Sequence, residues 1–135
     1  MNPRKLPTKP IGAAEARGRR KVAETYLEVA HLISNEDGTA INVCVGMAVL
    51  AGIAAADAIC AASLGERYSG TDHHAAASLL ERVDPRLGRV LRSLVELKGA
   101  SHYGHQLLTI SNRTAALRNA AALVTVAVHR TGGVS

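Results

Sequence analysis

The segment from Ala40 to Leu64 constrains this chain more than any other, because nearly every residue in it is apolar or glycine. A run of this length forms either a membrane-spanning helix or a helix buried on all sides in a bundle. Many of its residues are Ala or Gly, which barely favour lipid, and Asp57 would cost about 2.5 to 3.5 kcal/mol inside a membrane. We therefore expect the central helix of a bundle and no membrane span.

The flanking segments carry the periodicity of amphipathic helices, with apolar residues recurring at spacings of three and four, first along residues 13–34. Asp72 can cap a short helix, and Asp84 followed by Pro85 is typical of a helix start. A last helix is expected from about Ser111. Short connections between helices favour antiparallel neighbours. The sequence thus predicts an all-α fold without strands, an up-and-down antiparallel bundle of four to five helices.

The core of this bundle must be built from small side chains. The chain has 135 residues, enough for one domain, but it contains no Phe, no Trp and only three Tyr. Burial contributes about 25 cal/mol per Å² of apolar surface, so a core of Leu, Val, Ile and Ala gains less per residue than an aromatic one. We expect a homodimer, in which a second copy buries additional apolar surface.

Positive charge is concentrated at the start of the chain. Residues 1–21 hold seven basic residues against Glu15 alone, while the whole chain has a net charge of +5. Three prolines favour an extended, mobile arm. The predicted organisation is a basic flexible arm over 1–12, a helical bundle over 13–131 and a flexible tail over 132–135. The basic segment either contacts nucleic-acid phosphates, through Arg17, Arg19, Arg20 and Lys21, or is merely solvated.

Localisation and cofactors follow from what the sequence lacks. The charged start is not followed by the apolar stretch of a secretion signal, so we expect a cytoplasmic protein. Cys44 and Cys60 would lie about 24 Å apart in one helix, too far for a disulfide. The adjacent pair His73 and His74 has the wrong spacing for a metal site on a helix. No metal and no other cofactor is expected.

Uncommon polar chemistry is packed between Leu94 and Ser111, where Lys98, His102 and Tyr103 are the candidate catalytic residues. Asp57 joins them as a candidate, because an aspartate in an apolar helix is costly unless it is paired. It could orient His102, or form a structural ion pair with Arg67. Basic residues also recur every three to four positions on the preceding helix and form a candidate nucleic-acid-binding face with Arg86, Arg89 and Arg92.

The run LRSLVELKGASHYG, followed by a helical tail that begins ISNRTAAL, resembles the junction between the third and fourth helices of HEPN domains. ADAICAASLGERYSG and TDHHAAASLL are similar to the actinobacterial branch of that family. The resemblance covers most of residues 13–130. It implies a compact, usually dimeric helical bundle from a prokaryotic toxin–antitoxin or defence system, often encoded beside a nucleotidyltransferase-like partner.

Active members of the family cleave RNA without a metal, through an Arg followed four to six residues later by His. Here Lys98 stands where the Arg is expected, and three residues separate it from His102. Lys keeps the positive charge but lacks the planar fork that holds a phosphate in one orientation. Three functions stay open: a metal-independent ribonuclease, a non-catalytic protein that neutralises or positions a partner enzyme, and a nucleic-acid-binding regulator that uses the basic arm.

Overall fold

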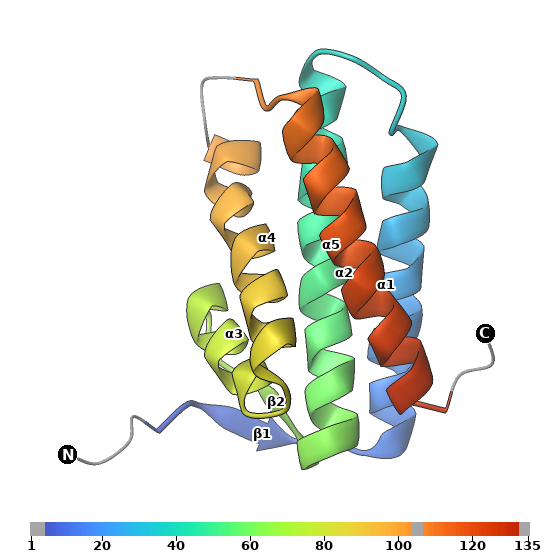
Figure 1. The fold of residues 1–135 in the computed structure, drawn as a ribbon. Coiled ribbons are helices and arrows are strands. Elements are labelled where there is room, and N and C mark those ends of the chain that lie inside the picture. The colour runs from blue at the N-terminus through green and yellow to red at the C-terminus, as the bar shows by residue number, and fades with distance from the viewer. Residues whose placement is uncertain (1–4, 104–106, 133–135) are drawn as a thin grey trace.

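The computed structural model describes residues 5–103 and 107–132, with side chains up to Gly99 and again from Leu107. In this part of the chain five helices account for most residues (Figure 1). They are α1 (Ala13–Leu32), α2 (Thr39–Leu64), α3 (His73–Glu81), α4 (Pro85–Tyr103) and α5 (Ile110–Arg130). Helices α1, α2, α4 and α5 alternate in direction, and the predicted all-α, up-and-down bundle is confirmed.

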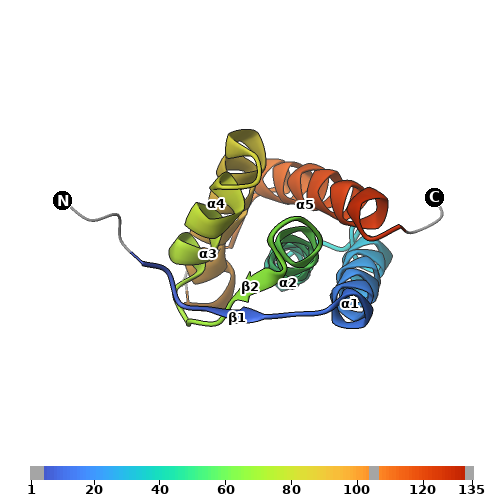
Figure 2. The ribbon, with the colours of Figure 1, turned by 90° about the horizontal axis from the view of Figure 1, so that it is seen from below.

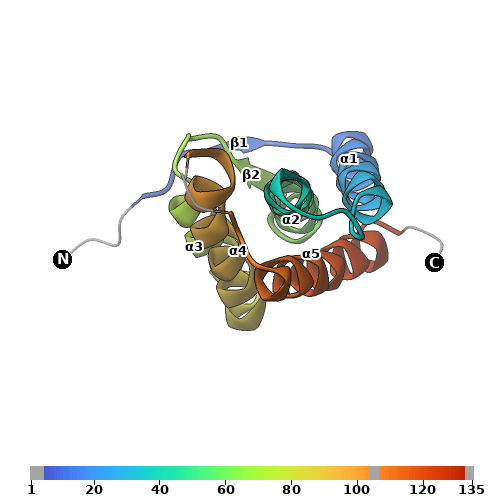
Figure 3. The same ribbon diagram turned by 90° about the horizontal axis from the view of Figure 1, so that it is seen from above.

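Helix α2 is the core of the fold. Seen along its axis, α1 and α4 lie on either side of it and α5 crosses one of its faces (Figures 2 and 3). It is long and apolar enough to span a membrane, with a mean hydropathy of 2.2 over its most apolar window, but 72% of that window is buried by the other helices. The apolar run therefore forms the central helix of a bundle, as its content of small residues predicted.

Small residues on α2 let the neighbouring helices approach closely. A side chain at Gly52 would place its Cβ 2.6 Å from Leu94 Cδ1 on α4 and 3.4 Å from Leu123 Cδ1 on α5. Both leucines are fully buried, so they have little room to move. Where α2, α4 and α5 meet, the core is thus filled by close approach of the helices and not by aromatic side chains.

The prediction that the chain has no strand is wrong. Strand β1 (Thr8–Pro10) pairs antiparallel with β2 (Glu66–Tyr68), with Thr8 opposite Tyr68. Backbone hydrogen bonds from Ile11 N to Gly65 O (3.1 Å) and from Ser69 N to Pro7 O (3.0 Å) extend this ribbon at both ends. Residues 7–11 are consequently fixed against the end of α2 and do not belong to a flexible arm.

Two helices begin where the sequence predicts, and an aspartate caps each of them. Asp72 accepts a hydrogen bond from His74 N (2.9 Å), and Asp84 accepts one from Arg86 N (2.8 Å) at the start of α4. The last helix begins earlier than expected, because the N-cap is Thr109 and not Ser111. Thr109 forms a reciprocal capping box with Asn112.

Candidate functional site

The packing of α3 against α4 positions the most polar part of the predicted site. The two helices are antiparallel: the Arg92 guanidinium binds Glu81 and donates to Ser78 Oγ at 3.3 Å. One turn before Arg92, Gly88 packs so closely on α3 that an added Cβ would lie 3.0 Å from Ala77 O. If this antiparallel register is followed toward the start of α3, His73 lies level with Lys98 on α4.

His73 is a further candidate for the site, which the sequence analysis considered only as a metal ligand. It is half-buried, and its pKa is lowered, first by burial and then by the positive charge of Lys98, while Asp72 acts in the opposite direction. Burial and the charge of Lys98 thus both favour the neutral form of this imidazole. Neither helix contains a signal for this pairing, because it depends on the register between them.

Two further candidate catalytic residues, His102 and Tyr103, lie in the last turn of α4. The helix continues past Gly99 to Tyr103, so positions 98 and 102 are one helical turn apart. The side chains of His102 and Tyr103 fall outside the described part of the chain. The structure thus places Lys98 and brings His73 to it, whereas the roles of His102 and Tyr103 stay predictions from sequence.

Asp57 is not brought to this site. Its Oδ2 atom lies 3.0 Å from Arg19 Nη2 and 3.2 Å from Arg19 Nε, in an ion pair that joins α2 to α1. Helices α1 and α4 lie on opposite sides of α2 (Figures 2 and 3), so Asp57 faces away from Lys98. Burial raises the pKa of Asp57, and Arg19 and then Arg67 oppose that effect. The expected structural ion pair is present, but its partner is Arg19 and Arg67 only lies nearby.

The basic residues of α1 do not form one uniform face. Arg19 is committed to Asp57, and Arg20 is largely covered, with its Nε atom 3.3 Å from Glu24 Oε1. Arg17 and Lys21 are exposed. Of the four residues predicted to contact nucleic acid, only these two point freely into solvent.

The arginines of α4 divide in a similar way. Arg86 and Arg89 are exposed, although Arg86 also lies 3.8 Å from an Asp84 carboxylate oxygen. Arg92 is only partly exposed and is held by Glu81 and Ser78. The candidate nucleic-acid-binding face on α4 therefore consists of Arg86 and Arg89, with Lys98 three turns from the helix start.

Cysteines and metal ligands add nothing to the site. Cys44 and Cys60 are buried free thiols. Among the side chains of residues 5–99 and 107–132, no three from His, Cys, Asp or Glu come close enough together to hold a metal ion.

No family model matches this chain, and neither does any curated protein.

Proposed function

We propose that this chain is a HEPN-like component of a prokaryotic toxin–antitoxin or defence module, that it works in the cytoplasm, and that it acts on RNA without a metal at the end of α4. The observation that carries the proposal is the half-buried His73 at the start of α3, close enough to Lys98 for the positive charge of the lysine to lower its pKa. Both groups sit on packed helices. Loops and helix ends held by a rigid scaffold are typical places for catalysis.

The chemistry requires two groups. A neutral imidazole can take the proton of a ribose 2′-hydroxyl, and a cation can stabilise the charge that develops on the attacked phosphate. His73 or His102 supplies the first group, and Lys98 supplies the second. Tyr103 would stack on a base or bind a phosphate. Exposed Arg86 and Arg89 would hold the backbone of the RNA along α4.

Incubation of the purified protein with total RNA in EDTA tests this function. We expect cleavage, and a loss of about 10²- to 10⁴-fold in rate for His102→Ala and for His73→Ala, because each removes a candidate proton-transfer group. Lys98→Ala should also lose activity. His129→Ala, an exposed histidine at the far end of α5, is the matched control and should cleave like the wild type.

Absence of cleavage at micromolar protein, or equal rates in His102→Ala, His73→Ala and wild type, would reject the ribonuclease. Circular dichroism of each variant separates loss of chemistry from loss of fold.

A second candidate function, a non-catalytic interaction protein, is favoured by an uncovered apolar face of α2. Val43 and Leu50 lie seven residues apart on α2, and neither side chain is fully buried. Val43 is 53% exposed. Helix α1 packs along α2, because Arg19 pairs with Asp57 near one end and Cys44 Sγ donates to Ala30 O near the other. Val22 and Val29 lie on α1 between these two contacts and are also exposed.

We propose that this face holds the second copy of a homodimer, and that a partner enzyme, such as a nucleotidyltransferase encoded nearby, binds the dimer. Light scattering should give the mass of a dimer for the wild type and of a monomer for Val43→Glu. Leu107→Glu, a change at an equally exposed residue in the α4–α5 connection, should leave the dimer intact. A monomeric wild type would reject the homodimer.

A further inference from the structure

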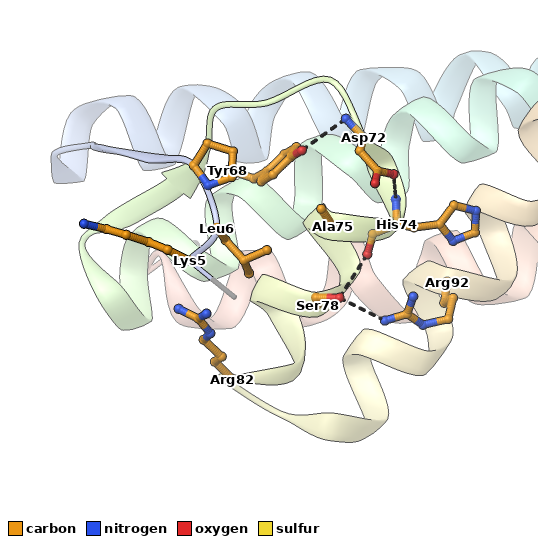
Figure 4. Close-up of a pocket in the computed structure, with 10 residues that line it drawn as sticks. Lys5, Leu6, Tyr68, Asp72, His74, Ala75, Ser78, Arg82 and Arg92 are labelled. Atoms are coloured by element: carbon orange, nitrogen blue, oxygen red, sulfur yellow. Dashed lines mark hydrogen bonds between the residues drawn. The ribbon is translucent and has the colours of Figure 1, made fainter. Parts of the chain in front are cut away.

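A concavity lined by several basic side chains, Lys98 not among them, lies between α3, α4 and the segment that precedes β1 (Figure 4). It encloses about 520 Å³, which is within the usual range for small-molecule sites. The face of α3 that lines it carries His74, Ser78 and Arg82, at intervals of four residues. Arg92 enters from α4, and Lys5 and Leu6 enter from the N-terminal segment.

Three cations from three separate segments therefore reach one pocket. In Figure 4, Lys5 and Arg82 lie on one side of Ser78 and Arg92 lies on the other. Arg92 is already bound to Glu81. Lys5 and Arg82 are exposed, and neither is within ion-pair distance of a carboxylate in residues 5–103 and 107–132.

The carboxylates near the pocket, those of Asp72 and Glu81, bind groups of the protein itself. Asp72 lines the pocket, but its Oδ1 atom accepts from His74 N at the start of α3. Glu81 neutralises Arg92. Lys5 and Arg82 remain as cations without a carboxylate partner, so the pocket stays net positive after the charges of Asp72 and Glu81 are counted, and the imidazole of His74 supplies a further donor.

The pocket is also held in shape. Ser78 Oγ donates to His74 O (3.3 Å) and accepts from Arg92 Nη2 (3.3 Å). The Tyr68 hydroxyl accepts from Asp72 N (3.1 Å) and so ties the β2–α3 connection to the ribbon. Pairing of β1 with β2 places the preceding residues, including Lys5, over α3. An apolar patch of Leu6, Pro7 and Ala75 lies beside these charges.

We propose that this pocket is a binding site for a phosphate monoester: Lys5 and Arg82 bind the doubly charged phosphate, and the apolar patch contacts the group that carries it. Arg is suited to this task because its planar fork binds two phosphate oxygens at once. The phosphate can belong to a free nucleoside monophosphate or to the 5′ end of an RNA. The site does not depend on the ribonuclease activity proposed above.

Calorimetric titration of the full chain tests the pocket, with AMP as the first probe and adenosine as its control without phosphate. AMP should bind and adenosine should not. Arg82→Ala and Lys5→Ala should each weaken AMP binding by about tenfold. Arg118→Ala removes an exposed arginine on α5, outside the pocket, and should leave the affinity unchanged.

A short oligoribonucleotide with a 5′-phosphate and the same oligonucleotide with a 5′-hydroxyl separate the two sources of phosphate. Tighter binding of the 5′-phosphorylated RNA than of AMP identifies an RNA end, and the reverse order identifies a free nucleotide. The proposal is overturned if neither AMP nor the phosphorylated RNA binds at millimolar concentration. It is also overturned if Arg82→Ala and Lys5→Ala bind as tightly as Arg118→Ala.

Discussion

Arg19 on α1 and Asp57 on α2 form the ion pair that connects the first two helices, with Arg19 Nη2 3.0 Å from Asp57 Oδ2. The carboxylate side chain is only 13% exposed, whereas the guanidinium is 36% exposed. The two partners are therefore unequal: loss of the arginine leaves a buried charge, and loss of the aspartate leaves a cation that can turn into water.

We expect Arg19→Met to lower the free energy of unfolding at neutral pH by about 1 to 3 kcal/mol, because Asp57 then lacks its nearest cation. Arg67 lies close enough to offset part of this loss. The double variant Arg19→Met/Asp57→Asn should regain most of the stability. Urea unfolding of the wild type, both single variants and the double variant measures the coupling. Additive effects of the two changes would contradict it.

The same aspartate predicts how stability depends on pH. Burial raises the pKa of Asp57 above its ordinary value of 3.8, so the folded chain binds this proton more tightly than the unfolded chain. The contribution of Asp57 to stability is then complete below pH 3.8 and is lost as the pH rises through the folded-state pKa.

Asp57→Asn removes this dependence, so the stability of the variant relative to the wild type should increase with pH in that window. Thermal unfolding of both proteins from acidic to neutral pH provides the measurement. Curves that stay parallel across the window would show that Asp57 does not titrate in this way.

Two glycines in helices should respond to substitution with opposite signs. Gly52→Val should destabilise the fold by about 1 to 3 kcal/mol, because the added side chain would overlap Leu94 and crowd Leu123. Gly18, on α1, has no heavy atom within 4 Å of an added Cβ. Gly18→Ala should therefore stabilise by about 0.5 to 1 kcal/mol through helix propensity alone. Denaturant unfolding of both variants checks the contrast, and equal effects would count against the close contact of α2 and α4.

The buried thiols should be inert in the folded protein. Burial, with a smaller contribution from the negative Asp57, raises the pKa of Cys60 to about 12. Burial also raises the pKa of Cys44, although Arg113 opposes the effect. At pH 8 both thiols stay protonated, and only the thiolate reacts with a thiol reagent. Labelling should be slow in buffer and fast in denaturing urea. Rapid labelling of the native chain would show that α2 is exposed.

Local signals in the sequence predicted the helices well. The apolar run of α2 can be buried on all sides only at the centre of a bundle. Asp84-Pro85 starts a helix through a hydrogen bond within one turn, from Arg86 N to Asp84. The last helix starts ahead of the predicted cap Ser111, because Thr109 forms a capping box with Asn112.

The features that sequence reasoning missed all depend on contacts between distant segments. Strand β1 has only three residues, the last of which is Pro10, and Pro7 precedes it, so the strand exists only because β2 lies beside it. The sequence predicted Arg67 as the ion-pair partner of Asp57, and only the packing of α1 on α2 brings Arg19 to that position. His73 reaches Lys98 through the register of α3 on α4, which no single helix encodes.

The ribbon of β1 and β2 also sets an order of events during synthesis. Residues 8–10 leave the ribosome well before residues 66–68, so β1 has no partner until all of α2 has been made. Helix α1 likewise meets the surface that buries it only when α2 emerges. The nascent N-terminal segment, with Lys5 and Lys9, therefore stays available to chaperones and to the polyanionic ribosome surface until translation has passed Tyr68.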